Sequence, residues 1–278
     1  MPGKKQVGVC LSPVLIEQFE VSNSIVVVID VLRATTSMIA GLHTGARSFI
    51  PVVGIEECRE YKDKGCLIAA ERNGEQIEGF DMGNSPYSFL EPEVIGRNIA
   101  MSTTNGTQAL NEAVRLGAKK VVVGSFANFN KLITWLKEEN ENVILFCSAW
   151  KGKPNLEDTI FAGAMVRRLR GHFALYEDTA LIAETLYRAA NRRKRYYIRN
   201  SSHFNRLMHI LQIQKDVKYS LRRDTHPVIP ILCEGILVDL ESDLYLGMIS
   251  GSKYLSGKNN GGNGKQKKSR ESRTEKVN

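Results

Sequence analysis

Short, continuous runs of apolar residues recur along the first 150 positions of the chain. Runs of this length, bounded by polar or glycine-rich stretches, are typical of strands that are buried on both faces of a sheet. The pattern predicts strands at residues 25–29, 48–53, 67–70, 98–101, 120–123 and 143–147.

Helical patterns fill the intervals between these strands. Apolar and small residues recur there at a spacing of three and four, and several of the stretches end at a glycine or at basic residues, as helices do. These patterns predict helices at residues 35–45, 55–64, 107–117, 128–139 and 157–169. The alternation of strands and helices predicts an α/β protein whose sheet is covered by helices on both faces.

The pattern changes after Gly171. Helices are predicted at residues 174–194, 201–212 and 217–223, and two closing strands at residues 228–232 and 235–239. The sequence has no internal repeat and no clear linker before residue 250. We therefore expect a single α/β domain at residues 1–250, with a helical subdomain at about residues 172–224 as the alternative.

The positive charge is concentrated at the C-terminal end. The formal net charge is +8, and residues 251–278 contribute +6 of it through eight Lys or Arg and two Glu. This segment is almost free of apolar residues after Leu255, so we predict a disordered basic tail. Such a tail, like the arginine-rich stretch 188–199, can attract nucleic acid. A solubilising extension is the simpler interpretation, and we do not expect a nucleic-acid partner.

The overall composition is that of a globular protein, with 42% hydrophobic and 24% charged residues. No stretch approaches the ~20 apolar residues that a membrane helix needs, and the first residues do not resemble a secretion signal. The five cysteines are scattered and include no C-x-x-C pair. We therefore expect a cytoplasmic protein with reduced thiols and no membrane contact.

The first candidate site follows the strand predicted at residues 25–29. Asp30 falls at the carboxyl end of this strand, which is where ligands bind in open α/β sheets. Arg33 follows, and Thr35 and Thr36 precede an apolar helix whose first amides can face an anion. The alternative is a turn in which Asp30 pairs with Arg33 and a threonine caps the helix.

The second candidate site is the segment Ser-Thr-Thr-Asn-Gly-Thr at residues 102–107, between a predicted strand and a predicted helix. Small polar residues around a glycine at a helix N-terminus form a nest of amides that suits a phosphate or a sulfonate. The alternative is a capped turn that is rich in threonine. The absence of any bulky residue favours anion binding.

Acidic and amide side chains form a third group. Glu71 and Arg72 end a predicted strand, and Asp81, Asn84 and Ser85 follow in a loop that glycine and proline shape. Carboxylate and carbonyl oxygens are the ligands that hard cations such as Mg²⁺ prefer.

Glu157 and Asp158 begin a predicted helix and can add two more carboxylates. By themselves they are better explained by helix capping and by pairing with the helix dipole than by metal binding. His203 stands at another predicted helix start, where a proton-transfer role and a surface cap are the two alternatives.

Six segments, in order along the chain, carry a resemblance to a known family. They are VIDVLRATT (28–36), ERNG (71–74), EGFDMGNSP (78–86), TTNGT (103–107), GSFAN (124–128) and NLEDT (155–159). These segments resemble the 2-phosphosulfolactate phosphatase family, and the similarity extends from about residue 7 to about residue 240. Phe204 follows His203 where the family pattern leads us to expect glycine, so no role is assigned to His203.

The resemblance implies a three-layer α/β/α sandwich with a mostly parallel or mixed central sheet. It implies magnesium-dependent hydrolysis of 2-phospho-3-sulfolactate to 3-sulfolactate and phosphate, a step associated with coenzyme M biosynthesis. The partner is then a small anionic phosphoester. A related phosphorylated sulfonate or hydroxy acid is the alternative substrate, and a homo-oligomer is one of the open oligomeric states.

A substrate with phosphate, sulfonate and carboxylate groups needs several cationic or amide donors and a metal ion. Asp30 and Arg33 are the predicted catalytic residues, with Asp30 as general base, nucleophile or metal ligand. The predicted Mg²⁺ ligands are Glu71, Asp81, Glu157 and Asp158. The predicted substrate-binding residues are Thr35, Thr36, Arg72, Asn84, Ser85, Thr103, Thr104, Asn105, Gly106 and Thr107.

Overall fold

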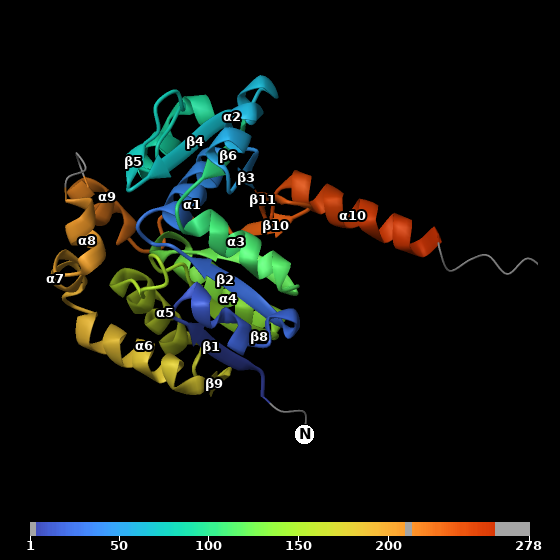
Figure 1. The fold of residues 1–278 in the computed structure, drawn as a ribbon. Helices are drawn as coiled ribbons and strands as arrows, with labels where there is room; N and C mark the ends of the chain where they lie inside the picture. The colour runs from blue at the N-terminus through green and yellow to red at the C-terminus, as the bar shows by residue number, and fades with distance from the viewer. Residues whose placement is uncertain (1–3, 209–212, 259–278) are drawn as a thin grey trace, which may run out of the picture.

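The computed structural model describes residues 4–208 and 213–258 (Figure 1). Its strands are β1 (Gln6–Cys10), β2 (Ser24–Ile29), β3 (Ser48–Pro51), β4 (Leu67–Arg72), β5 (Glu75–Gln76), β6 (Asn98–Ser102), β7 (Lys120–Gly124), β8 (Asn142–Cys147), β9 (Ala174–Tyr176), β10 (Pro230–Cys233) and β11 (Ile236–Asp239). Its helices are α1 (Ala34–Thr44), α2 (Ile55–Asp63), α3 (Gly106–Arg115), α4 (Phe129–Glu139), α5 (Leu156–Leu169), α6 (Glu177–Ala190), α7 (Lys194–Arg199), α8 (Ser202–Leu207), α9 (Ile213–Ser220) and α10 (Asp243–Lys258).

The described strands form one mixed sheet in the order β5-β4-β6-β3-β11-β10-β7-β2-β8-β1-β9. Strands β4, β6 and β3 form one parallel block, and β7, β2, β8, β1 and β9 form another. The antiparallel hairpin β10–β11 joins the two blocks by pairing with β7 on one side and β3 on the other. The predicted α/β class with a mixed central sheet is therefore confirmed.

The alternating side chains of β2 show why both faces of the sheet are covered. Val26 and Val28 pack in a cluster with α1 and α3, whereas Ile25, Val27 and Ile29 pack in a second cluster with α4 and α5. Successive side chains of a strand point to opposite faces, and a strand buried on both faces is apolar throughout. The continuous apolar runs of the sequence thus correspond to central strands between two helical layers.

The predictions are less accurate after Gly171. The helix predicted at residues 174–194 was wrong at both ends. Ala174–Tyr176 form β9, which pairs with β1 at the sheet edge, and α6 ends at Ala190 before a turn at residues 191–193. The pattern also missed β1 itself, because Gly8 interrupts its apolar residues, whereas those of β2 form a continuous run. The strand conformation of both segments depends on pairing with strands that are distant in the sequence, which local periodicity does not reveal.

Helices α7, α8 and α9 cover one end of the sheet (Figure 1). Their buried residues Ile198, Phe204, Leu207, Ile213 and Val217 form a separate small cluster with Leu32 of the β2–α1 turn. This packing fixes α8 next to the carboxyl end of β2.

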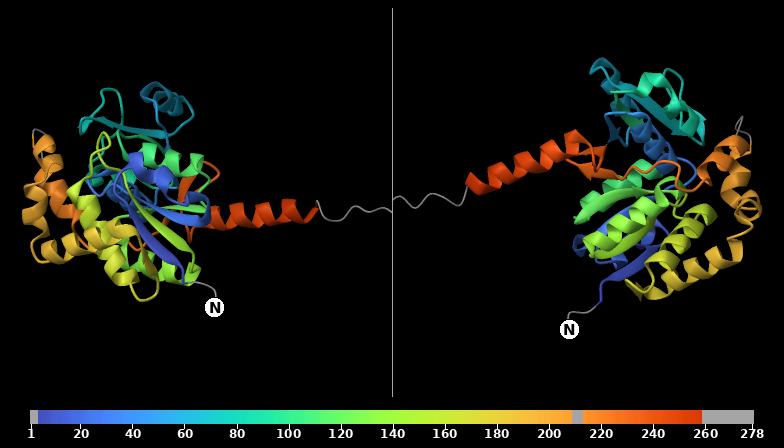
Figure 2. Two further views of the ribbon diagram at one scale, coloured as in Figure 1. Left: turned by 60° about the horizontal axis from the view of Figure 1, so that its bottom comes forward. Right: turned by 180° about the vertical axis from the view of Figure 1, so that it is seen from behind.

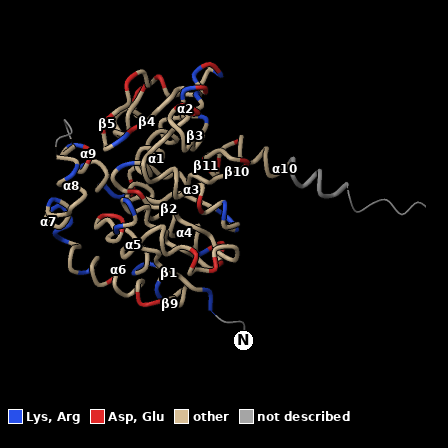
Figure 3. The backbone as a smooth tube through the Cα atoms, viewed as in Figure 1, with Lys and Arg blue, Asp and Glu red and all other residues tan. Residues whose placement is uncertain are grey.

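Helix α10 projects away from the body of the protein (Figure 2). It continues to Lys258 and therefore includes the first eight residues of the tail that the sequence predicts to be disordered, 251–258. Residues 259–278 lie outside the described residues, so the disorder of that part stays a prediction. The other basic stretch, 188–199, includes α7, where basic residues gather at the outer edge of the molecule (Figure 3).

None of the described helices is long and apolar enough to cross a membrane. All five cysteines are free thiols, and four of them are buried.

Candidate active site

The turn after β2 places Asp30 at the bottom of a cavity. Thr35 closes this turn, because its hydroxyl accepts a hydrogen bond from the Asp30 amide (3.1 Å) and donates one to the Asp30 carbonyl (2.8 Å). The Thr36 hydroxyl donates to the Val31 carbonyl in the same way (2.9 Å). Both threonines are fully buried, so their hydroxyls shape the turn and do not line the cavity.

The turn between β6 and α3 is held by a similar exchange. Thr107 Oγ1 accepts from the Thr103 amide (3.1 Å), and Thr103 Oγ1 accepts from the Thr107 amide (3.1 Å). The Thr104 amide donates to Glu71 Oε1 (2.8 Å). Within the described part of the chain, the amides of Asn105 and Gly106 have no hydrogen-bond acceptor, and the Thr104 hydroxyl also has no partner. These donors of the turn remain for a ligand.

Gly106 brings this helix start against Asp30. A Cβ atom on Gly106 would lie 2.6 Å from Ala34 Cβ and 3.2 Å from Asp30 Oδ2. Only glycine fits at this position, because a real Cβ cannot approach another carbon so closely. The absent side chain therefore allows the N-terminus of α3 to face the Asp30 carboxylate, as the sequence predicts for an anion nest.

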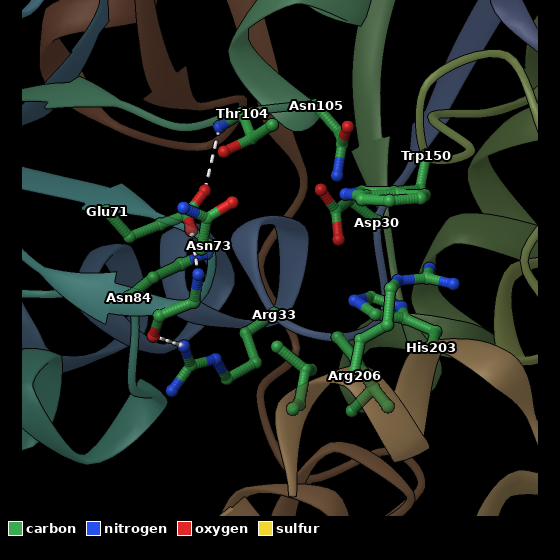
Figure 4. A pocket seen from close by; sticks show the side chains of 13 residues that line it. Asp30, Arg33, Glu71, Asn73, Asn84, Thr104, Asn105, Trp150, His203 and Arg206 are labelled. Carbon is green, nitrogen blue, oxygen red and sulfur yellow. Dashed lines mark hydrogen bonds between the residues drawn. The ribbon is translucent and has the colours of Figure 1, made fainter. Parts of the chain in front are cut away.

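The cavity has a volume of about 240 Å³ and opens at the carboxyl ends of β2, β4 and β6 (Figure 4). Its lining residues are Asp30, Leu32, Arg33, Glu71, Asn73, Gly74, Asn84, Thr104, Asn105, Trp150, His203, Arg206 and Leu207. Six residues of the predicted site thus share one cavity: Asp30, Arg33, Glu71, Asn84, Thr104 and Asn105.

Glu71 forms part of the β4 side of the cavity and is held by two amides. Its Oε1 accepts from the Thr104 amide, and its Oε2 accepts from the Gly74 amide (2.7 Å). The Asn73–Gly74 turn, in which both residues have positive φ, curls the chain back so that this second bond can form. The Asn84 Oδ1 atom, on the same side, is buried without a partner and remains available to a ligand.

Behind the cavity lies a group of buried acids. Glu157 and Asp158, in the first turn of α5, are completely buried. Glu157 Oε1 pairs with His203 Nδ1 at 2.5 Å, and Asp158 Oδ1 accepts from the Val31 amide at 2.8 Å. Glu157 Oε2 and Asp158 Oδ2 have no partner in the described part of the chain. Buried carboxylate oxygens without a donor normally have a metal ion, a water or a proton as their partner.

The electrostatics reflect this crowding of carboxylates. Burial raises the pKa of Asp30 to about 6, while His203 lowers it and Glu71 and Glu157 raise it. Burial, followed by the charges of Glu157 and Asp30, holds the pKa of Asp158 well above its ordinary value. Burial disfavours the charged form of His203, but Glu157 and Asp30 outweigh it, so that the pKa of His203 is raised. The carboxyls of Asp30 and Asp158 are therefore harder to ionise than free carboxyls.

The donor chemistry of this group fits a hard divalent cation. The oxygens are carboxylates, and two of them lack partners. As the side chains lie, no three His, Cys, Asp or Glu residues among residues 4–208 and 213–258 are arranged to hold a metal ion. The fit is thus one of donor type and charge, not of a completed coordination shell.

Arg33 is buried and committed to protein partners. Its Nη1 donates to Asp216 Oδ2 of α9 (2.7 Å), and its Nη2 donates to the Gly74 carbonyl (2.5 Å). Ser85 Oγ donates to the other Asp216 oxygen (2.8 Å), so Ser85 supports this ion pair and does not line the cavity. Arg33 therefore ties the β2–α1 turn to α9 and to the Asn73–Gly74 turn.

Two other predicted site residues lie outside the cavity. Arg72 donates to the carbonyls of Glu71 and Val53 and to the Ser102 hydroxyl, so it joins strand ends. Asp81 pairs with Lys62 Nζ at 2.9 Å and accepts from the Ile68 amide at 3.0 Å. The structure does not bring Asp81 together with Glu71, Glu157 and Asp158.

Comparison with known proteins shows the family of this chain. The family model described as 2-phosphosulpholactate phosphatase matches residues 10–235. The chain belongs to the 2-phosphosulfolactate phosphatase family.

Relatives in this family include a protein of Thermotoga petrophila, named "Probable 2-phosphosulfolactate phosphatase", which is 35% identical over 76% of this chain and 90% of its own length. Proteins with the same name from Caldicellulosiruptor saccharolyticus and Symbiobacterium thermophilum are 35% and 34% identical over 73% and 80% of this chain and 86% and 97% of their own lengths. By these names the family is one of phosphoric monoester hydrolases.

In this member of the 2-phosphosulfolactate phosphatase family, sequence reasoning missed four residues of the site. Asn73 could have been found, because Asn-Gly is a turn signal next to Glu71. Trp150, Arg206 and Asp216 carry no local signal, since they reach the site from a loop and from two helices that pack there late in the chain. His203 was weighed as a helix cap, but its ring is buried against Glu157.

Proposed function

We propose that this protein hydrolyses 2-phospho-3-sulfolactate to 3-sulfolactate and inorganic phosphate, with Mg²⁺ as the cofactor. The observation that carries the proposal is the cavity in which Asp30, Glu71 and Asn105 at the start of α3 meet, in a chain of this family. The cavity combines donors for an anion with carboxylates that suit a cation, which is the combination a phosphomonoesterase needs.

The amides of Asn105 and Gly106 are the groups that would bind the phosphoryl oxygens. They stand at the N-terminus of α3, where the helix dipole adds to their positive potential. Asp30 lies beside Gly106, and its raised pKa of about 6 suits a general base at neutral pH. In this proposal Asp30 takes the proton of the attacking water.

His203 would serve as the acid. Glu157 holds the ring through Nδ1, which leaves Nε2 as the nitrogen that can face the substrate. Its raised pKa favours the protonated form near neutral pH. His203 would then donate a proton to the oxygen that leaves phosphorus, so that Asp30 and His203 act as base and acid.

Glu71, Glu157 and Asp158 are the residues that would hold Mg²⁺, and Asp81 is left out because it lies elsewhere. The cation would neutralise the charge of the transferred phosphoryl group. A readout independent of turnover is the thermal stability of the protein. Mg²⁺ should raise the Tm of the wild-type protein after treatment with EDTA, and E157Q should reduce that rise.

Phosphate release with purified protein tests the function. The substrates are 2-phosphosulfolactate, 2-phospholactate and a simple aryl phosphate, each with Mg²⁺ and with EDTA. We expect the highest kcat/KM for 2-phosphosulfolactate and loss of activity in EDTA. Equal rates for all three substrates would contradict the proposed substrate, and full activity in EDTA would contradict the metal.

A further inference from the structure

Arg206 occupies the α8 side of the cavity and has no polar partner there. It lies one turn after His203 on α8, is half-buried and lines the cavity. Its guanidinium carbon lies 3.9 Å from the centroid of the Trp150 ring. Within the described residues, no hydrogen bond or ion pair to Arg206 accompanies this stacking, so its donors remain for a ligand.

The other arginines near the site are already satisfied. Arg33, the second arginine of the cavity lining, is balanced by Asp216 and donates to the Gly74 carbonyl. Arg72 binds backbone carbonyls outside the cavity. Among the described arginines of the cavity lining, Arg206 is therefore the one without a hydrogen bond or ion pair. Burial lowers its pKa because water is partly removed from it, and the charge of Glu157 partly offsets this effect.

The position of Arg206 separates it from the groups that would bind phosphate. Asn105 and Thr104 lie at one end of the cavity, whereas Arg206 and His203 lie at the other, on α8 (Figure 4). A substrate whose phosphoryl group sits at the start of α3 would extend its remaining anionic groups toward Arg206. A guanidinium on an aromatic ring is weakly hydrated and planar, which suits an oxyanion with delocalised charge such as a sulfonate.

We propose that Arg206, held by Trp150, binds the sulfonate of the substrate and thereby sets the preference for sulfonated phosphoesters. This inference rests on the proposed function. It assigns the recognition of the sulfonate to a residue of α8, whereas the amides at the start of α3 would bind the phosphate. The expected consequence is a loss of affinity that depends on the sulfonate and not on the other two anionic groups.

Three substrates separate the anionic groups in the test. 2-Phosphosulfolactate carries all of them, 2-phospholactate lacks the sulfonate, and the phosphate ester of 2-hydroxyethanesulfonate lacks the carboxylate. In R206M, kcat/KM should fall between about tenfold and about a hundredfold for both sulfonated substrates, because a charge-assisted hydrogen bond is lost. The value for 2-phospholactate should stay within about twofold of wild type.

Two further variants serve as controls. R206K keeps the charge without the planar fork and should recover part of the loss. R223M removes an arginine that also stacks on an aromatic ring, 3.6 Å from the Phe129 centroid, but outside the cavity. It should leave the ratio between the substrates unchanged, and the Tm of each variant shows whether the fold is retained.

The outcomes separate this inference from the proposed function. If the wild-type protein does not prefer 2-phosphosulfolactate over 2-phospholactate, both are overturned. If the wild-type protein shows the preference and R206M keeps it, the proposed function stands and the sulfonate role of Arg206 is overturned. An equal loss for all three substrates, or a loss confined to those with a carboxylate, overturns the role as well.

Discussion

The two walls of the cavity differ in how far the fold uses their polar groups. On the sheet wall, at the ends of β2, β4 and β6, Thr35, Thr103, Thr107 and Glu71 are occupied by hydrogen bonds within the protein. On the helical wall, Arg206 stacks on Trp150 and keeps its donors. The sheet wall is thus organised before a ligand arrives, whereas the helical wall offers a guanidinium that has no hydrogen bond or ion pair among the described residues.

The difference shows that a motif with many polar residues need not have many residues that contact a ligand. Most polar side chains of the motifs build the turns that carry the few groups left for a ligand, namely the Asp30 carboxylate and the amides of Asn105 and Gly106. Preorganised donors of this kind bind an anion without reorganisation. The preference for one substrate over another would then depend on the helical wall, where Arg206 has no hydrogen-bond partner among the described residues.

The largest effect should come from Asp30→Asn on the sheet wall. Loss of a general base reduces kcat by about 10²- to 10⁴-fold with little change in KM, and steady-state kinetics measure both. Asp81→Asn is the matched control, because this carboxylate pairs with Lys62 outside the cavity, and its kcat should stay near wild type. An unchanged kcat in Asp30→Asn would remove Asp30 from the chemistry.

Asp216→Ala tests the buried ion pair between Arg33 of the β2–α1 turn and Asp216 of α9. It leaves the buried Arg33 guanidinium without its counter-charge, so the free energy of unfolding should fall by about 3–5 kcal/mol in urea titrations. Glu241→Ala breaks the more exposed pair with Lys131 and should cost at most about 1 kcal/mol. Equal costs for the two variants would mean that Arg33 is not held as we describe.

Gly106→Ala tests the close approach of α3 to the β2–α1 turn. The added Cβ would lie 2.6 Å from Ala34 Cβ, so overpacking should lower the free energy of unfolding by about 1–3 kcal/mol and also reduce kcat. Gly247→Ala on α10 has open space around its Cβ and should be neutral or slightly stabilising. A Gly106→Ala protein with wild-type stability and turnover would contradict this geometry.

The pH profile sharpens the role assigned to Asp30. A general base must be ionised, so kcat/KM should rise as the pH increases through about 6, the pKa of Asp30. Since the Glu71 carboxylate raises this pKa, Glu71→Gln should move the acid limb to lower pH. The profile is measured at saturating Mg²⁺, because Glu71 is also one of the proposed Mg²⁺ ligands and its loss lowers the rate at every pH. Glu78→Gln, at an exposed position, should leave the limb in place. A shift toward higher pH in Glu71→Gln would contradict the coupling.

The smallest effect should come from Arg72→Met. Arg72 contacts the backbone at strand ends and does not line the cavity, so KM should stay within about twofold of wild type. The comparison is with R206M under the same conditions. A KM increase as large as that of R206M would place Arg72 in contact with the substrate.

The sequence by itself determined the elements of the sheet wall. The apolar runs at residues 25–29 and 98–101 are buried strands, and the threonine- and glycine-containing turns that follow them are bonded within five residues. Such features depend on periodicity and on local hydrogen bonds, which a single sequence displays directly. Because strand ends of an open α/β sheet meet at one edge, the sequence also predicts one site for Asp30, Glu71, Asn84, Thr104 and Asn105.

Only the tertiary structure decided which charges are free. Arg33 and Asp216 are 183 positions apart, and nothing in the sequence near Arg33 indicates that its charge is balanced. Likewise, Asp81 has the same carboxylate group as Asp30, but it forms an ion pair with Lys62. Arg206 reaches the cavity because α8 packs on Leu32. Whether a polar group is available depends on partners that folding brings from far along the chain, and the residue type alone does not reveal them.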